Sequence, residues 1–345
     1  MRRVRPAHLA LGALGVLVIG ATFLVVLPEI ASYGSVVDRV RALSPADTVL
    51  LVALAVLNVV TFAPPLMAAL PGLGFRRALS SSQIAAAFAH AVPAGDALGA
   101  GAQVALYRRW GFAPQPIAVA LALVGACNGL FFAALPPLGV LLLQLDGERR
   151  DGLLLLSLAA VGALAVIAGA VAGVIRSDDA ARRAGALAAR LCAPALRIAR
   201  RGPAGDWGAH LVGFRREGIG VLRRRWAGLL LGTLASNLAV LACVVVSLRL
   251  CGADAAQLSW QEILVAWSLT RLLLLVPITP GGIGLVELGM TGLLVAFGGS
   301  SDAVVAGVLL ERALTFLPPI ALGAAYGAAL GVSRRGAVRD APTAG

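Results

Sequence analysis

Long apolar runs separated by short arginine-bearing segments dominate this sequence. A membrane-spanning helix needs about 20 consecutive apolar residues, and six runs reach that length: residues 7–27, 48–70, 115–143, 152–175, 227–248 and 302–330. Two further regions, residues 80–106 and 260–298, are apolar but are interrupted by proline and glycine. We therefore predict an all-α, polytopic integral membrane bundle that forms a single domain over residues 1–345. It has about six full spans and two re-entrant or broken helical hairpins.

Clusters of arginine between the runs predict the orientation, because cytoplasmic loops are enriched in basic residues. Four clusters flank the first run, both ends of region 80–106 and the last run: Arg2, Arg3, Arg5, Arg76, Arg77, Arg108, Arg109, Arg334, Arg335 and Arg339. The strongest marker is the basic segment 176–226, with twelve arginines against four acids, in which residues 180–201 read as an amphipathic helix. This pattern predicts a multi-pass protein of the bacterial inner (cytoplasmic) membrane with both termini in the cytoplasm.

Composition supports a membrane protein and argues against several other classes. Hydrophobic residues make up 59% of the chain and charged residues 13%, whereas soluble domains have roughly 45–50% and about 25%. The net charge is +12, and all 29 basic residues are arginine. Since these arginines flank apolar runs, lipid headgroups explain them better than nucleic acid does. The four cysteines and three histidines share no metal-ligand spacing, so we expect no metal and no cofactor.

The interruption at residues 277–289 is the most informative motif, and it reads PITPGGIGLVELG. Unsatisfied backbone groups in lipid cost several kcal/mol each, so such a break requires protein or a water-filled cavity around it. The helix that follows Gly282 would offer free N–H groups and a positive dipole end. Gly281 and Gly282 would let a ligand approach the backbone closely. These features predict a site for an anion such as a lipid phosphate.

Ionisable residues within apolar segments are functional candidates, because isolated charge inside a bilayer is costly. Arg271 and Glu287 flank the break and are plausible ion-pair partners, whereas the adjacent Glu311 and Arg312 should find separate partners. The alternative for the first pair is purely structural: Glu287 neutralises the helix end and Arg271 holds it. The predicted headgroup-binding set comprises Asp96, Arg271, Pro280, Gly281, Gly282, Gly284, Glu287 and Arg312. His90 is interpreted as a packed or headgroup-facing residue.

Three interpretations of function remain open. The first is a lipid-binding or lipid flippase-like protein with a headgroup site at the broken helices. The second is a membrane-embedded enzyme acting on a lipid or polyprenyl substrate, although no GxSxG, HExxH or Walker A motif is present and we predict no catalytic residue. The third is a scaffold whose basic segment recruits a partner. Homo-oligomerisation is compatible with all three.

The break also carries a family resemblance. Pro277, Thr279, Pro280, Gly281, Gly282, Gly284 and Glu287 form a Pro-x-Thr-Pro-Gly-Gly-x-Gly-x-x-Glu run that resembles the transmembrane family of lysylphosphatidylglycerol synthase, the flippase-like domain. A second similarity is Pro93-Ala-Gly-Asp96, followed by Tyr107-Arg-Arg-Trp-Gly111, and the order of segments is similar over residues 7–332.

This resemblance implies a membrane protein that binds lipids or moves them between leaflets, here without an aminoacyl transferase domain. The chain departs from the family pattern after Asp96, where an arginine commonly follows but Gly99 and Ala100 occur instead. The two interrupted regions would open from opposite faces of the membrane, so an inverted repeat is a further hypothesis.

Overall fold

The computed structural model describes residues 38–92, 95–145, 207–273 and 279–339, with short pieces at 161–162, 169, 177–179 and 182–183. All regular elements in these ranges are helices. The predicted span 7–27 lies outside the described residues. So do the predicted span 152–175 and the amphipathic helix 180–201, apart from those short pieces.

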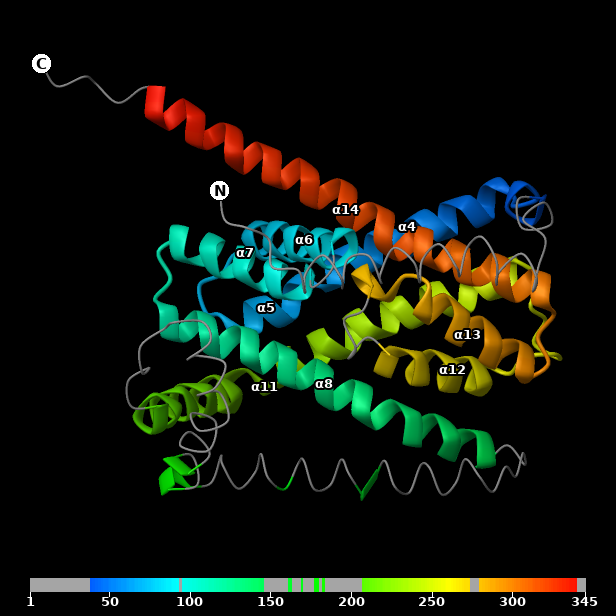
Figure 1. Cartoon of the computed structure of the whole chain (residues 1–345), viewed down its shortest axis with the longest axis horizontal. Coiled ribbons are helices and arrows are strands. Elements are labelled where there is room, and N and C mark those ends of the chain that lie inside the picture. The colour runs from blue at the N-terminus through cyan, green and yellow to red at the C-terminus, as the bar shows by residue number, and fades with distance from the viewer. Residues whose placement is uncertain are drawn as a thin grey trace, which may run out of the picture.

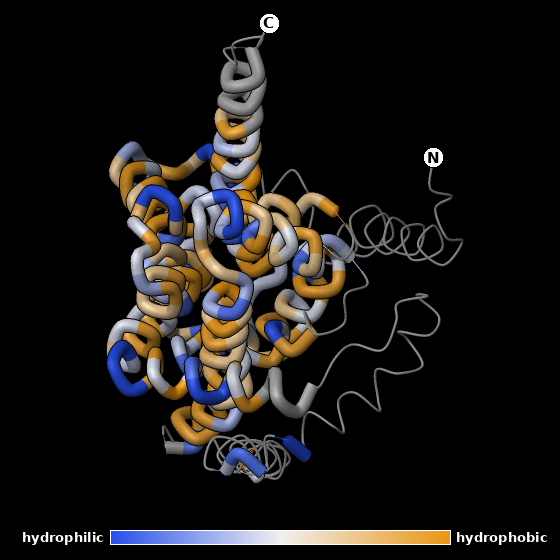
Figure 2. The backbone as a smooth tube through the Cα atoms, turned by 90° about the vertical axis from the view of Figure 1, so that its left-hand side faces the viewer, coloured by the Kyte–Doolittle hydropathy of each residue, from blue (hydrophilic) through white to orange (hydrophobic). Residues whose placement is uncertain are grey.

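The described helices follow the chain in this order: α4 (Pro45–Thr61), α5 (Ala63–Ala69), α6 (Phe75–Ala91), α7 (Gly95–Arg109), α8 (Pro114–Leu145), α11 (Trp207–Leu250), α12 (Trp260–Leu273), η2 (Pro280–Gly282), α13 (Leu285–Ala296) and α14 (Ser301–Arg339) (Figure 1). Four helices in this part of the chain are long and apolar enough to cross a membrane: α4 with α5, α8, α11 and α14. They overlap four of the six predicted spans. Hydrophobic positions occur throughout the described bundle (Figure 2). Together with the four apolar helices, they confirm a polytopic helical membrane protein.

Local sequence explains where several of these helices begin and change direction. At the start of α4, Ser44 and Asp47 form a reciprocal capping box with Pro45 in the first turn. Helix α11 departs from helical geometry at Arg225, which has φ −133° and ψ 16°. That kink separates its arginine-rich first part from its apolar second part.

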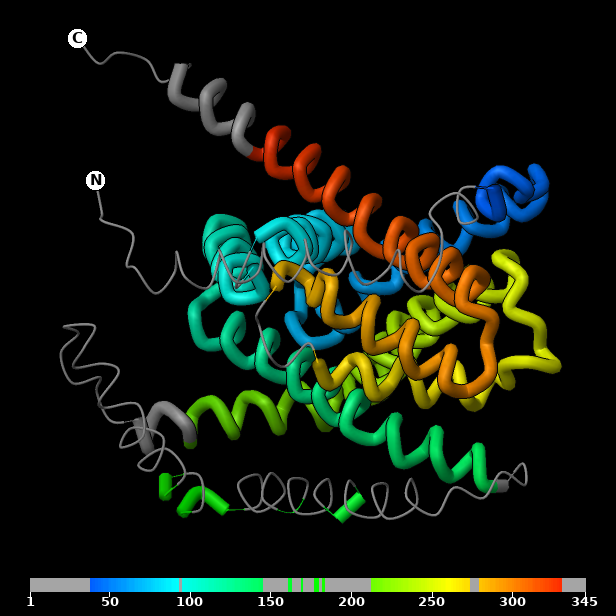
Figure 3. Tube along the Cα trace, turned by 45° about the vertical axis from the view of Figure 1, so that its right-hand side comes forward, coloured from blue at the N-terminus to red at the C-terminus, as the bar shows by residue number. Residues whose placement is uncertain are grey.

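Both interrupted regions form helical hairpins, as the sequence predicted. In the first, α6 and α7 run antiparallel and pack so closely that a Cβ at Gly99 would lie 2.6 Å from the carbonyl oxygen of Ala85. In the second, α12 leads through the break and η2 into α13. The hairpins enter the bundle from opposite ends, and the η2 turn contacts the end of α6 (Figure 3).

Two apolar cores hold the hairpins in place. One, which includes Tyr107, Ile117 and Leu229, joins α5, α6, α7, α8 and α11. The other, which includes Trp267 and Leu294, joins α8, α11, α12, α13 and α14. The described part of the second break, η2, contacts α6 beside the cavity described below.

Candidate functional site

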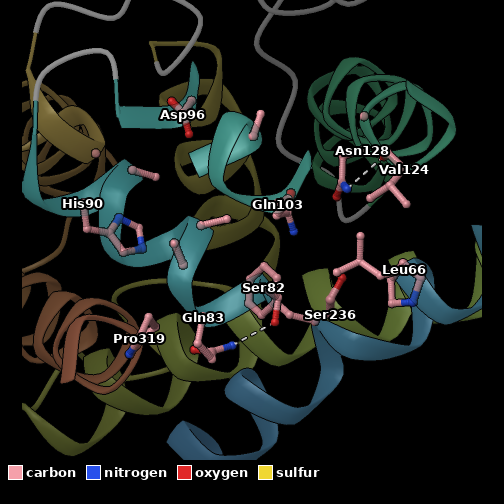
Figure 4. Close-up of a pocket in the computed structure, with 18 of the residues that line it drawn as sticks. Leu66, Ser82, Gln83, His90, Asp96, Gln103, Val124, Asn128, Ser236 and Pro319 are labelled. Carbon is pink, nitrogen blue, oxygen red and sulfur yellow. Dashed lines mark hydrogen bonds between the residues drawn. The ribbon is translucent and has the colours of Figure 1, made fainter. Parts of the chain in front are cut away.

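A cavity of about 500 Å³ lies beside the meeting point of the two hairpins (Figure 4). It is bordered by α5, α6, α7, α8, α11, α12, η2 and α14. Small side chains on α6, namely Ala85, Ala86 and Ala89, leave much of this space open. Four of the predicted site residues border the cavity: Asp96, Arg271, Gly281 and Arg312.

The predicted ion pair between Arg271 and Glu287 is wrong, because Glu287 pairs with Arg312 instead. The Nε atom of Arg312 lies 2.9 Å from Oε1 of Glu287. The Oε2 atom of the same carboxylate accepts a hydrogen bond of 2.6 Å from the backbone N–H of Gly284. This cap fixes the carboxylate in the first turn of α13, and α13 packs against α14, which carries Arg312.

The capping carboxylate also changes the interpretation of the Pro-Gly run. Glu287 is 2% exposed and occupies the N-terminus of α13, where the sequence predicted an external anion. Gly282, Gly284 and Pro280 are absent from the residues that border the cavity. Gly281 does border it, so this glycine is the part of the predicted run that a ligand in the cavity could reach.

The adjacent residues Glu311 and Arg312 were expected to have separate partners, and the structure bears this out only in part. Arg312 finds its close partner on α13, yet its Nε also lies 3.8 Å from Oε2 of Glu311. Glu311 accepts a hydrogen bond of 3.2 Å from the hydroxyl of Thr315, one turn further along. Both carboxylates are therefore held near one guanidinium inside the bundle.

Arg271 forms no salt bridge with a described residue. Its guanidinium lies over the indole of Trp267 at 5.1 Å and over the ring of Phe132 at 6.0 Å. Within the described parts of the chain no hydrogen bond reaches it, and the Glu311 carboxylate interacts with it only through longer-range electrostatics. Since an isolated charge at membrane depth is costly, this cation at the cavity wall is available to an anionic ligand.

His90 joins the two arginines at this end of the cavity, in line with its interpretation from the sequence as a packed or headgroup-facing residue. Its ring stacks on Phe316 with a centroid distance of 3.9 Å and an interplanar angle of 18°. The Arg312 guanidinium lies 4.9 Å from the centroid of the same phenylalanine. We call the group of Arg271, Arg312 and His90 the cationic end.

Gly281 is essential to this arrangement because it adopts φ +56°, a conformation that side chains disfavour. A Cβ at this position would lie 2.9 Å from Cε2 of Phe316 and 3.0 Å from Nδ1 of His90. The glycine therefore lets the turn of one hairpin approach the aromatic stack on the other.

The opposite end of the cavity is polar but carries no charge. Ser82, Gln103, Asn128 and Ser236 border it from α6, α7, α8 and α11 (Figure 4), and we call these four residues the uncharged end. Sequence reasoning missed Gln103. The available signal was its spacing, since Asp96 and Gln103 are seven residues apart and face the same cavity from α7.

Asp96 itself lies in the first turn of α7, is exposed and sits where the cavity approaches the hairpin turn. The departure from the family pattern after Asp96 has a steric explanation at Gly99, because any side chain there would collide with α6. Among the described residues, no group of three or more His, Cys, Asp or Glu side chains could hold a metal ion.

Comparison with protein families agrees with this architecture. The family model described as the lysylphosphatidylglycerol synthase TM region matches residues 11–323, a range that includes both hairpins and every residue of the cavity. A comparison with curated proteins found no match.

Proposed function

Because the chain belongs to the lysylphosphatidylglycerol synthase transmembrane family, whose members are membrane proteins related to lipid handling, we propose that it binds the anionic headgroup of a membrane lipid in this cavity. The bound lipid then moves between the leaflets of the bacterial inner membrane. The observation that carries the proposal is Arg271, a cation at the cavity wall that forms no salt bridge or hydrogen bond with a described residue.

The chemistry of the cationic end supports a phosphate ligand. An arginine offers a planar set of N–H donors that matches phosphate oxygens. Arg312 uses its Nε against Glu287, and no hydrogen bond within the described chain engages its two terminal nitrogens. A phosphate between Arg271 and Arg312 would therefore meet donors from two helices that belong to different parts of the fold.

The arrangement of the hairpins supports movement between leaflets. Discontinuous helices that meet near the bilayer midplane are the usual location of substrate sites in transporters with inverted repeats. Here each hairpin enters from a different end and their turns meet beside the cavity. We propose that both are re-entrant and that the end carrying Arg76, Arg77, Arg108 and Arg109 faces the cytoplasm.

The test is a transport assay on the full chain in proteoliposomes with fluorescently labelled phosphatidylglycerol. Dithionite quenching of the outer leaflet reports the rate of movement. We expect Arg271→Gln to lower this rate by about tenfold, the effect of roughly 1.4 kcal/mol. Arg76→Gln removes an exposed arginine far from the cavity and is the matched control.

Equal rates for wild type and Arg271→Gln, with both proteins folded, would contradict the site assignment. The proposal includes no chemical step. Conversion of the added lipid to a new product by the purified chain would favour the membrane-enzyme alternative instead.

A further inference from the structure

We propose that the lipid headgroup carries, beyond its phosphate, a neutral polyhydroxylated group that binds the uncharged end of the cavity. Examples of this chemistry are an inositol or sugar ring joined to a phosphate. The inference rests on the proposed function, because it assumes that the phosphate occupies the cationic end. It adds the substrate class, which the family match does not specify.

Gln103 is the residue that points to this ligand. Its side chain is 9% exposed, yet the described residues give its amide no hydrogen bond. Its amide atoms are not sealed inside the packed interior but remain accessible from the cavity. Gln103 lies at the cavity wall and points into it (Figure 4), so a bound ligand can satisfy both its carbonyl oxygen and its amide nitrogen.

The neighbouring polar groups are already oriented as hydrogen-bond acceptors. The hydroxyl of Ser82 donates to the carbonyl oxygen of Leu79 at 2.9 Å, and that of Ser236 donates to Thr233 at 2.9 Å. Each hydroxyl has thereby used its one proton. The oxygen of Ser82 also accepts a hydrogen bond of 3.3 Å from Nε2 of Gln83, and each hydroxyl oxygen retains at least one lone pair. A ligand group that can both donate and accept hydrogen bonds would match the serine oxygens and the amide of Gln103. Hydroxyl groups can do both.

Asn128 completes the uncharged end in a fixed orientation. Its Nδ2 donates to the carbonyl oxygen of Val124 at 3.0 Å, and its Oδ1 accepts a hydrogen bond of 3.1 Å from Asn237. The side chain is therefore held rigidly, with one acceptor direction on Oδ1 remaining. A rigid polar wall favours binding because little rotamer freedom is lost when the ligand arrives.

Charge argues against the two other common headgroup types. A second anionic group would find no cation at the uncharged end. A headgroup amine would meet repulsion from Arg271 and Arg312 at the cationic end, and no carboxylate belongs to the uncharged end. Glu287 is paired with Arg312 and caps α13, while Asp96 lies exposed near the hairpin turn.

The spacing between the two ends fits a ring-sized group. A Cβ at Gly95 would meet the carbonyl oxygen of Phe88, and one at Gly99 would meet that of Ala85. This antiparallel register places Gln103 at the level of Ser82. Ser82 precedes His90 by eight residues on α6, so the two ends are about 12 Å apart along the helix.

The experiment is a lipid titration of the detergent-solubilised full chain, followed by native mass spectrometry. The panel contains short-chain phosphatidylinositol, a polyprenyl phosphosugar, phosphatidic acid and lysylphosphatidylglycerol. We expect wild type to bind one or both polyol lipids at least about tenfold more tightly than phosphatidic acid. The two polyol lipids distinguish a glycerolipid source from a polyprenyl source of the same chemistry.

Two substitutions of Gln103 test the assignment. Gln103→Leu removes the amide at similar size, and we expect it to abolish most of the preference over phosphatidic acid while the affinity for phosphatidic acid itself is unchanged. Gln103→Glu adds a carboxylate, and we expect it to raise the affinity for lysylphosphatidylglycerol by about tenfold. A gain of binding cannot result from misfolding.

The inference is overturned if Gln103→Leu leaves the polyol preference intact. It is also overturned if Gln103→Leu lowers the affinity for every lipid together with thermal stability, because that result indicates a structural role. The proposed function fails in a different way, namely if Arg271→Gln leaves the affinity for phosphatidic acid unchanged.

Discussion

Removal of the charge on Glu287 should destabilise the protein through Arg312. In Glu287→Gln the side-chain oxygen can still accept the hydrogen bond from Gly284, so the cap on α13 is retained. What is lost is the partner of a guanidinium that is 9% exposed. Stranding one member of a buried ion pair costs about 3–5 kcal/mol, so we expect a loss of about 3 kcal/mol. Glu287→Ala also loses the cap and should cost about 1 kcal/mol more.

A double-mutant cycle separates the pair from its surroundings. Arg312→Met alone should also cost about 3 kcal/mol, because it leaves the carboxylate unpaired. The double variant Glu287→Gln/Arg312→Met removes both charges and should cost no more than either single change. The expected coupling energy is therefore about 3 kcal/mol, far above the roughly 0.5 kcal/mol scatter of independent sites.

The assay is SDS-induced unfolding of the full chain in mixed micelles, followed by circular dichroism and extrapolated to zero SDS. Asp47→Asn is the matched control, because Asp47 also takes part in a capping box but lies at the protein surface, and its replacement leaves no buried cation without a partner. We expect it to have little effect. Additive costs for Glu287→Gln and Arg312→Met, within about 0.5 kcal/mol, would refute the inferred pair.

Three further outcomes follow from the described packing. Gly281→Ala places a Cβ at φ +56°, 2.9 Å from an aromatic carbon of α14, and should lower the free energy of unfolding by about 1–3 kcal/mol. Gly292→Ala is the control, because a Cβ there meets open space and should leave the free energy of unfolding unchanged. Gly323→Ala brings a Cβ 2.5 Å from α6 and should lower thermal stability, whereas Gly327→Ala on the same helix meets nothing and should leave it unchanged. A hydrogen bond from Arg216 on α11 lowers the pKa of Asp178 from 3.8. The ion pair between Asp178 and α11 should therefore be fully formed above pH 3.8 and weaken as the pH falls through the lowered pKa. Hydrogen exchange at the start of α11, followed as the pH is lowered from 7 through the acid range, measures this change, and protection that stays constant at every pH would contradict it.

The apolar pattern predicted the fold well because membrane helices are defined locally. The runs at 48–70, 115–143, 227–248 and 302–330 correspond to described helices, since each needs only its own length of apolar side chains. The two interruptions were also predicted as hairpins, from proline and glycine together with the arginine pairs that bound region 80–106. These features depend on short stretches of sequence, which composition reveals directly.

The partners within the site could not be predicted in the same way. Arg271 and Arg312 are both plausible counter-ions for Glu287, and only the packing of α13 against α14 decides between them. Gln103 carries no recognisable motif, and its importance arises from the register of α7 on α6. Such choices depend on long-range contacts between helices, which periodicity within one helix does not determine.

Helix α6 has a consequence for how the protein is made. It carries the consecutive polar residues Ser80, Ser81, Ser82 and Gln83, all buried within the bundle, and it packs most extensively against α7 and α14. The three serine hydroxyls donate to carbonyl oxygens one turn earlier in α6, so the helix satisfies them without help from other elements. The amide of Gln83 reaches the carbonyl oxygen of Val59 on α4, which is synthesised before α6. Because α14 is synthesised more than 200 residues after α6, the apolar contacts between these two helices form only late in assembly, although the polar groups of α6 can find partners as soon as α4 and α6 have been made.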